Sequence, residues 1–371
     1  MSEANANDHQ AETPHAGAQP LGGSPLLEVV DLSVSFDTPR GAVQAVQGVS
    51  FSLERGKTLG IVGESGSGKS VTSKALMGLL PHRRTTTKGS VMFEGRELLG
   101  QSAEEYRALW GQEMAMVFQD PMTALNPVMK IGQQITESLR LNLDMDKQTA
   151  KETAIALLGA VRIPSPERRF KDYPGQMSGG MRQRVVIAVA LACGPKLLFA
   201  DEPTTALDVT VQAQILDLLE EQQRERFMAM ILVTHDLGVV AGRADEIAVM
   251  YAGRIVERAS TRSLFQNMQH PYSEALLASI PKLSDPSHTR LDSIPGAPPS
   301  LLKPPQGCSF APRCRYADAQ CHAERPPLRE VPGDPGHMYA CFHPVSSEYA
   351  VHIRSQSAGT SGTSSAAGVA Y

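Results

Sequence analysis

A glycine-rich segment has the residue types and the spacing of a phosphate-binding loop. It matches G-x-x-x-x-G-K-[ST], lies between an apolar strand pattern and a helical pattern, and consists of Gly63, Glu64, Ser65, Gly66, Ser67, Gly68, Lys69 and Ser70. The glycines let backbone N–H groups wrap a phosphate chain, Lys69 reaches the terminal phosphates, and Ser70 can ligate Mg²⁺. The alternative is a glycine-rich turn with an unrelated lysine, for which a chance match has odds of roughly one in a hundred. The segment therefore predicts a nucleotide site.

Two adjacent carboxylates can complete such a site. The apolar run 197–200 ends in Asp201 and Glu202. Alone, an apolar run that ends in Asp-Glu is weak evidence. Next to a phosphate loop, the first carboxylate is suited to hold Mg²⁺ and the second to orient or deprotonate a water molecule. Together the two segments predict a nucleoside triphosphatase.

A second glycine-containing helix start occurs shortly before this acidic strand. The segment MSGGMRQR, residues 177–184, opens a helical pattern with Ser178 as its N-cap and Gly194-Pro195 as its stop. A helix N-terminus attracts anions, and one triphosphate does not need two such sites in one chain. Here the sequence resembles the ATP-binding cassette family, whose signature is usually LSGGQ. The first and fifth positions depart from that signature, as the peptide-transporter branch tolerates.

Other marks of this family follow in order. Gln119 matches the Q-loop glutamine that links Mg²⁺ to the transmembrane partner, the ALD segment at 206–208 resembles the D-loop, and His235 resembles the switch histidine. Phe36 stands where the family places an aromatic that stacks on adenine. Taken alone, Phe36 would be a core or strand aromatic and His235 a hydrogen-bonded loop histidine. Their functional interpretation depends on the whole series.

The resemblance implies a site that two cassettes share. In this family two cassettes pair head to tail, with ATP between the phosphate loop of one and the signature of the other. It implies Glu202 as the general base, His235 as the residue that positions the γ-phosphate and water, and Mg²⁺ at Ser70, Gln119 and Asp201. The residues expected to serve the partner's nucleotide in trans are Ser178, Gly179, Gly180, Met181 and Asp208. ATP binding would close the dimer and hydrolysis would open it.

Longer segments resemble one branch of the family, the D-type ATP-binding subunits of oligopeptide and dipeptide importers. They are DEPTTALDVTVQAQILDLL, HDLGVVAG, MYAGRIVE, HPYSEALLASIP and IPGAPPSLLKPPQGCSFAPRC, and the resemblance covers roughly 26–344. It implies a peripheral ATPase on the cytoplasmic side of the inner membrane. Its partners would be a sister ATPase in a heterodimer, two permease subunits and an extracytoplasmic peptide-binding protein. Because selectivity would rest with those partners, nickel chelates, glutathione or another solute stay open as alternatives to peptides.

A non-transport cassette ATPase that acts on DNA or ribosomes is the competing class. DNA-repair members carry long coiled-coil or zinc insertions between the Q-loop and the signature, whereas 120–177 holds only 58 residues and no heptad run. Ribosome-acting members usually hold two cassettes in one chain, and this chain has one. The net charge of -4 gives no electrostatic reason to expect nucleic acid.

Four of the five cysteines fall within one short stretch, with the spacing C-x5-C-x6-C-x19-C; they are Cys308, Cys314, Cys321 and Cys341. The spacing fits neither zinc ribbons nor the usual ferredoxin run. In a reducing compartment such thiols are metal ligands more often than disulfides, and four sulfurs suit an iron–sulfur cluster or zinc. The resemblance favours a [4Fe–4S] cluster with a structural role; zinc or unligated thiols are the alternatives. Cys193 lies elsewhere and is expected to be packing.

The elements that must position these residues follow from the hydrophobic pattern. Segments 27–34, 49–53 and 58–62 predict a small antiparallel sheet that leads into a buried strand. The runs 116–118, 197–200 and 231–234 are apolar on both sides, as in parallel strands covered on both faces. These patterns indicate an α/β protein with a doubly wound core. The resemblance implies a RecA-like parallel sheet, an antiparallel β subdomain and an α-helical signature subdomain.

The domain organisation follows from changes in composition. We expect a disordered tail at 1–25, the ATPase domain at 26–270, a small loop-rich extension with the four cysteines at 271–345, and a flexible tail at 346–371. No run approaches the ~18 to 20 apolar residues of a membrane span, and the N-terminus lacks the pattern of a secretory signal. A cytoplasmic chain that meets the membrane through other subunits is therefore expected.

Overall fold

The computed structural model describes residues 24–205, 207–280 and 294–351. Most of the two predicted tails, at 1–25 and 346–371, lies outside the described residues, as does Ala206 of the D-loop. The folded part continues past the expected boundary at 345, because Ala350 is fully buried and packs in a small cluster with Tyr316 and Val345.

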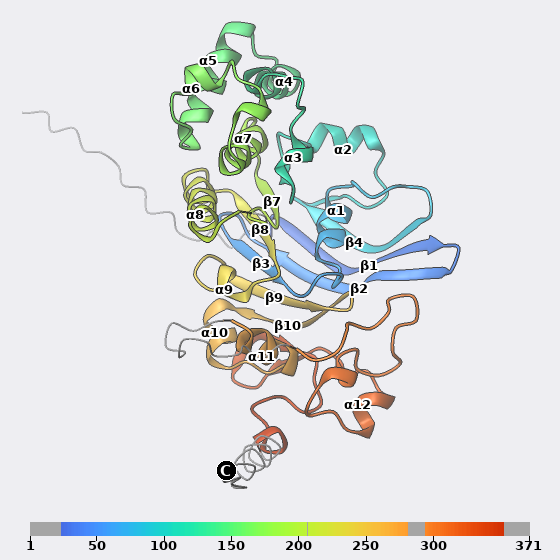
Figure 1. Ribbon diagram of the computed structural model, residues 1–371. Coiled ribbons are helices and arrows are strands. Elements are labelled where there is room, and N and C mark those ends of the chain that lie inside the picture. Colours follow the sequence, from blue (N-terminus) through green and yellow to red (C-terminus); the bar gives the residue numbers. More distant parts are fainter. Residues whose placement is uncertain (1–23, 206, 281–293, 352–371) are drawn as a thin grey trace, which may run out of the picture.

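The central element is an eight-stranded sheet in the order β11-β12-β10-β9-β3-β8-β7-β6 (Figure 1). Its parallel strands are β3 (Thr58–Val62), β6 (Met114–Val117), β7 (Leu197–Asp201), β8 (Ala229–Thr234) and β9 (Glu246–Tyr251). Along β7, Leu198 and Ala200 join one apolar core while Leu197 and Phe199 join another. Such two-sided burial is typical of parallel strands, so the predicted doubly wound core is confirmed.

A second sheet, antiparallel and four-stranded, packs beside the first and shares its second core. Its order is β2 (Gly41–Leu53), β1 (Leu27–Thr38), β4 (Thr85–Phe93) and β5 (Arg96–Glu97). β1 and β2 are longer than the predicted segments, because their outer halves form a hairpin whose exposed residues carry little apolar signal. This sheet is the expected antiparallel β subdomain.

Four helices form one group, and the others are distributed around the sheets and the C-terminal part (Figure 1). At the end of the molecule opposite the C-terminal part lie α4 (Ile131–Leu143), α5 (Lys147–Ala160), α6 (Pro166–Arg169) and α7 (Gly179–Leu191). The others are α1 (Lys69–Leu76), α2 (Ala103–Leu109), α3 (Pro121–Ala124), α8 (Val209–Glu225), α9 (Leu237–Val240), α10 (Thr261–Gln266), α11 (Pro271–Ala278) and α12 (Ala319–Ala323), with 3₁₀ turns at Pro174–Gln176 and Ala311–Arg313. Within the described part of the chain, none of the helices combines the length and the apolar character that a membrane span requires.

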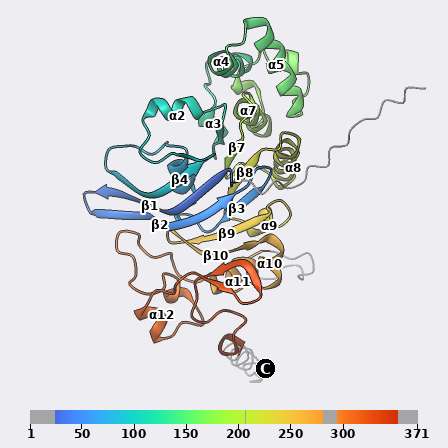
Figure 2. The same ribbon diagram turned by 180° about the vertical axis from the view of Figure 1, so that it is seen from behind.

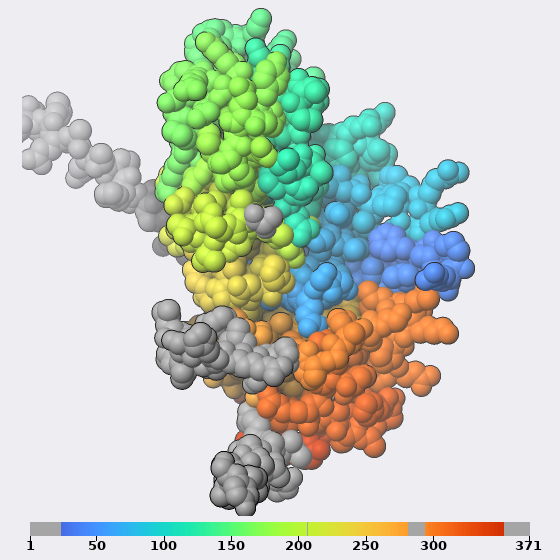
Figure 3. All heavy atoms as spheres, in the orientation of Figure 1, coloured from blue at the N-terminus to red at the C-terminus, as the bar shows by residue number. Residues whose placement is uncertain are grey.

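The C-terminal extension joins the main sheet instead of forming a separate loop-rich appendage. Strand β12 (Asp334–Tyr339) pairs with β10 (Arg254–Ser260), and β11 (Arg329–Val331) pairs with β12. The fully buried Glu257 accepts hydrogen bonds from the backbone amides of Gln269 and His270 and contacts the His337 ring at 2.9 Å. Figures 2 and 3 show this part of the chain (orange and red) at the other end of the molecule from the helical layer (green).

Candidate functional site

The phosphate loop connects the fully buried strand β3 to helix α1. Gly68 is the N-cap of α1 at φ 102, in the left-handed region, and a Cβ there would lie 2.5 Å from the carbonyl oxygen of Ala45. A Cβ at Gly63 would lie 2.1 Å from the carbonyl oxygen of Met250. Both glycines are therefore required by the close approach of neighbouring backbone, which holds the loop in a tight turn.

Lys69 and Ser67 place a buried ammonium group and a buried hydroxyl group inside this loop. Lys69 is 4% exposed, and its ammonium donates to the carbonyl oxygens of Gly63 at 2.7 Å and Glu64 at 3.1 Å. Burial lowers the pKa of Lys69, although the nearby Glu202 and Asp201 oppose the shift. The buried hydroxyl of Ser67 has no hydrogen-bond partner among the described residues. A buried unpaired hydroxyl beside an ammonium group fits an anionic phosphate.

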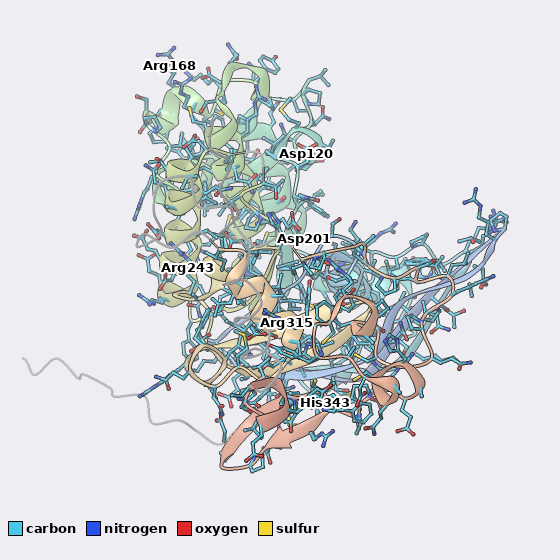
Figure 4. All side chains as sticks on the ribbon, turned by 60° about the horizontal axis from the view of Figure 1, so that its bottom comes forward. Asp120, Arg168, Asp201, Arg243, Arg315 and His343 are labelled. Atoms are coloured by element: carbon cyan, nitrogen blue, oxygen red, sulfur yellow. The ribbon has the colours of Figure 1, made fainter. Side chains whose placement is uncertain are left out.

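Two of the three predicted Mg²⁺ ligands, Ser70 and Asp201, lie together, whereas Gln119 contacts Glu202. The hydroxyl of Ser70, on α1, donates to Asp201 Oδ1 at 2.9 Å from the end of β7. Burial raises the pKa of Asp201, while the Ser70 hydrogen bond lowers it. A hydroxyl and a carboxylate are oxygen ligands of the kind that Mg²⁺ prefers. Figure 4 shows Asp201 between the helical part, which carries Asp120, and the C-terminal part, which carries Arg315 and His343.

Glu202 is surrounded by the other residues predicted to act in hydrolysis. Its Oε2 accepts hydrogen bonds from Gln119 Nε2 and Thr205 Oγ1, both at 3.0 Å, and lies 3.4 Å from His235 Nδ1. Glu202 has φ 46, and strained non-glycine backbone of this kind is found at functional sites. Thr205 was not predicted from the sequence, although a hydroxyl residue three positions after Glu202, in DEPTT, is near enough along the chain to reach its carboxylate.

A cavity of about 550 Å³ brings most of these groups together, although Asp201 and Thr205 do not line it. It is lined by residues 64–71, Gln119, Glu202 and His235, together with Leu276, Ser279 and Ile294 from the C-terminal part of the chain. Phe36 does not line this cavity; it is half-buried on β1 against the core between the two sheets. The adenine contact therefore stays a prediction.

The signature residues do not line this cavity either. Ser178 is the predicted N-cap of α7 and accepts a hydrogen bond from the Met181 amide. Asp208 similarly caps α8 by accepting from the Val211 amide at 2.9 Å. A Cβ on Gly180 would come within 2.7 Å of Val211, so the signature packs directly on the segment after the D-loop. The chain holds its signature away from its own phosphate loop.

The four clustered cysteines also come together. All four thiols are free and line one small cavity with Phe310, Tyr316, His270 and His343. The Tyr316 amide donates to Cys314 Sγ at 3.4 Å. Burial raises the pKa of all four thiols, that of Cys314 to about 12 and that of Cys321 to about 11. Thiols in such surroundings ionise when a cation binds, and backbone amides that point at the sulfurs are a feature of iron–sulfur sites.

A different ligand set overlaps with this one. Among the described residues, Asp318, Cys321 and His343 bring their ligand atoms within 4.8 Å of one another, as a single metal ion requires. Of the four thiols, only that of Cys321 belongs to this group. His343 Nε2 lies 2.8 Å from Asp318 Oδ2, and the Cys321 amide donates to Asp318 Oδ1 at 2.9 Å. Cys193 lies elsewhere, half-buried against Asn142 and the Ser138 carbonyl group.

The fold and the phosphate site define an ATPase of the ATP-binding cassette class. Residues 46–205 match the family model described as ABC transporter, and residues 256–321 match the oligopeptide/dipeptide transporter C-terminal region. The dimeric structure of a post-hydrolysis state of the ATP-binding cassette MJ0796 bound to ADP and Pi matches with a TM-score of 0.58 and 25% identity, over 64% of this chain and 99% of that one.

Sequence relatives narrow the class. The chain is 53% identical over 320 residues to the oligopeptide transport ATP-binding protein OppD of Escherichia coli (strain K12), covering 86% of this chain and 94% of that protein. It is 52% identical over 307 residues to the dipeptide transport ATP-binding protein DppD of Lactococcus lactis subsp. cremoris (strain MG1363), covering 82% and 88%. The chain belongs to the oligopeptide/dipeptide group of the ABC transporter family, as the resemblance of its motifs predicted.

Proposed function

We propose that this chain binds ATP and Mg²⁺ at the phosphate loop and powers the uptake of short peptides across the inner membrane. The observation that carries the proposal is the setting of Glu202. Its carboxylate accepts a hydrogen bond from Gln119 and lies beside His235 at the edge of the phosphate-loop cavity. A carboxylate at that place can take a proton from water next to a bound γ-phosphate.

In the proposed reaction, water attacks the γ-phosphorus and Glu202 accepts a proton from that water. The bond between the γ-phosphorus and the bridging oxygen breaks, and its electron pair leaves with ADP. Lys69 would neutralise charge on the phosphate oxygens, and a Mg²⁺ ion held by Ser70, Gln119 and Asp201 would supply further positive charge.

A second cassette would complete this site. The His235 side chain is 62% exposed, and Val209, next to Asp208, is 81% exposed. The signature at 178–181 lies outside the cavity of its own phosphate loop. These features support a site that closes against a partner, which we propose to be a sister ATPase in a heterodimer, with Ser178, Gly179, Gly180, Met181 and Asp208 acting in trans.

The relatives' names support peptides as the solute. We propose that the chain docks on two permease subunits at the cytoplasmic face of the inner membrane and depends on an extracytoplasmic peptide-binding protein. Nickel chelates and glutathione are the alternative solutes, because the solute would be selected by those partners and not by this cassette.

The test is to purify this chain with its membrane partners and measure peptide uptake into vesicles. The Lys69→Ala variant should lose ATP binding and uptake together. Lys151→Ala, at an exposed lysine on α5, is the matched control and should transport like the wild type. Uptake that continues without ATP, or in the Lys69→Ala variant, would contradict the proposal.

The cysteine cavity is proposed to hold a [4Fe–4S] cluster at Cys308, Cys314, Cys321 and Cys341. Four thiols that line one small cavity are the ligand set that such a cluster requires. When bound, the cluster would cross-link a part of the chain that is poor in apolar residues. Zinc is the second candidate, favoured by the closer set of Asp318, Cys321 and His343.

The iron–sulfur cluster and zinc would be held by different residues, so variants can distinguish them. Protein purified without oxygen should be brown, with an absorption shoulder near ~400 nm, if iron and sulfide are bound. Cys308→Ser should then abolish the colour while His343→Ala retains it. Colourless protein with stoichiometric zinc, lost on His343→Ala and kept on Cys308→Ser, would reject the cluster in favour of zinc.

A further inference from the structure

Residues 308–341, which carry the four clustered cysteines, are called the cysteine module, and one of its arginines contacts the phosphate loop. Arg313 precedes Cys314, and its side chain is only 4% exposed. Its Nη1 donates to Glu64 Oε2 at 2.6 Å and its Nη2 to Glu64 Oε1 at 2.9 Å. Glu64 is the second residue of the phosphate loop. This two-pronged contact fixes both the direction and the distance of the carboxylate.

The guanidinium group is itself held in place. Its Nε donates to the carbonyl oxygen of Pro295 at 2.8 Å, and Nη2 also lies 3.3 Å from the carbonyl oxygen of Ile294. Nη1 further contacts the hydroxyl of Tyr251 at 3.2 Å. The Arg313 side chain is therefore buried and held by several contacts, unlike an exposed arginine that pairs with a carboxylate on the surface.

Glu64 is held through its backbone as well. Its amide donates to the hydroxyl of the fully buried Tyr272 at 2.8 Å, and its carbonyl oxygen accepts from Lys69 Nζ. The same residue thus connects the extension to the lysine that is expected to contact the terminal phosphates. A shift of Glu64 would change the loop that carries Lys69.

Phe310 makes a second connection between the module and the loop. It lies, like Arg313, between Cys308 and Cys314, and it lines the cysteine cavity. Its ring packs at 5.3 Å on both Tyr251 and Tyr272, whose rings are 4.6 Å apart. Tyr251 and Tyr272 are the residues that contact Arg313 and Glu64, respectively. A continuous set of packed rings and hydrogen bonds therefore runs from the thiols to the phosphate loop.

We propose that Arg313 is a positioning residue for the phosphate loop and that the metal group at Cys308 and Cys314 holds Arg313 in place. Loss of the metal group then weakens Mg·ATP binding through Glu64. This inference rests on the proposed function, since it assumes that the loop binds Mg·ATP and that the thiols bind metal. The competing explanation is that the ion pair only fastens the extension to the core, in which case nucleotide affinity in folded protein is independent of it.

The test measures the affinity of the purified full chain for Mg·ATP by calorimetry, together with thermal unfolding. Arg313→Met, which removes the charge and the fork but keeps most of the volume, should weaken binding by on the order of tenfold. Arg313→Lys should restore little, because an ammonium group cannot make the two-pronged contact. The control is Arg315→Met, at the neighbouring arginine labelled in Figure 4, which is 54% exposed and should bind like the wild type.

A double-mutant cycle separates positioning from fastening. Glu64→Gln combined with Arg313→Met should be no weaker than the worse single variant, because both remove one contact. Cys314→Ser should lower bound metal and Mg·ATP affinity in the wild-type background but lower affinity no further beside Arg313→Met. Elemental analysis gives the metal content independently of nucleotide binding.

Three results would overturn the inference. If the folded Arg313→Met variant binds Mg·ATP with wild-type affinity, the ion pair only attaches the extension to the core. Cys314→Ser that loses its metal but keeps its affinity would uncouple the module from the loop. If the wild type itself fails to bind Mg·ATP, the proposed function falls and this inference falls with it, whereas the first two results leave the proposed function intact.

Discussion

The phosphate loop and the cysteine module organise their functional groups in opposite ways. Eight consecutive residues make the loop, between a strand that is wholly buried and a helix that begins inside the motif. The module draws its thiols from residues 308–341 and has only two very small apolar clusters of its own. The loop is therefore shaped by local backbone geometry and a large core, while the module depends on its sulfur atoms and on contacts with the rest of the chain.

This difference predicts two kinds of variant. Changes at the residues proposed to act in hydrolysis around the loop should alter ATP turnover and leave the fold intact. Changes in the module should first alter metal content and stability. A change at the ion pair between Arg313 and Glu64 is expected to affect both stability and nucleotide binding, because this ion pair joins the module to the loop.

The largest effect is expected from Glu202→Gln. If Glu202 is the general base, as proposed, its removal should slow ATP turnover by about 10³-fold, while nucleotide binding and thermal unfolding stay close to the wild type and the dimer is trapped closed. Turnover of the assembled transporter is the measurement. Glu221→Gln, at the half-exposed α8 glutamate that pairs with Arg162, is the control. Turnover within threefold of the wild type would show that another group is the base.

Cys341→Ser tests the cysteine module. Loss of one thiol ligand should weaken metal binding by about 100-fold or more and destabilise the extension. Cys193→Ser is the matched control, because its thiol lies outside the cavity and contacts Asn142. Iron and zinc are measured by elemental analysis. Equal metal content in both variants would contradict a metal site at these thiols.

His337 on β12 contacts Glu257 on β10, and we expect the strength of this clamp between the extension and the main sheet to depend on pH. Burial by itself would lower the pKa of His337, but its hydrogen bonds with Glu257 and Asp334 outweigh burial and raise that pKa. A group whose pKa rises on folding stabilises the fold below its unfolded value, near 6.5 for histidine, and loses this contribution as the pH rises through the folded pKa. The clamp should therefore be strongest in mildly acidic solution.

The variant that tests the clamp is His337→Gln. It should lower the free energy of unfolding by about 2 kcal/mol in mild acid, since a hydrogen bond between charged groups is lost. The difference from the wild type should shrink as the pH rises. His82→Gln, at an exposed histidine, should show no such trend. A difference that stays constant with pH would mean that His337 contributes through packing alone.

The smallest effect is expected at Phe36. If its ring stacks on adenine, Phe36→Leu should weaken ATP binding by about tenfold, because stacking of a base on an aromatic ring contributes roughly 1–3 kcal/mol. Val30→Ala, at an exposed position of the same strand, is the control. Unchanged affinity would assign Phe36 to the core between the sheets, where it already packs.

Much of the site follows from local sequence because its geometry is local. Gly68 needs left-handed backbone where β3 turns into α1, and Ser178 caps α7 through its own helix start. The hydrophobic pattern likewise located β3, β6, β7 and β8 within two residues, whereas β9 was not predicted. Each of these features depends on neighbours a few residues away, so composition and spacing are sufficient to predict it.

The C-terminal extension was harder to predict. Strand β12 has the sequence DPGHMY, which carries no alternation of apolar residues, and it becomes a strand because β10 offers an edge and Glu257 binds His337. Tertiary contacts override weak local preference in such a segment. The hairpin was therefore expected as a loop.

The sequence by itself determined the family, the phosphate loop, the paired carboxylates and the cluster of thiols, since each is a short pattern with a chemical reason for its spacing. Only the tertiary structure decided that Gln119, Thr205 and His235 converge on one carboxylate, and that Arg313 contacts a loop residue 249 positions earlier. The reason is physical: a contact between distant residues depends on how the sheets and helices pack, and an ion pair leaves no periodic mark in the residues around either partner.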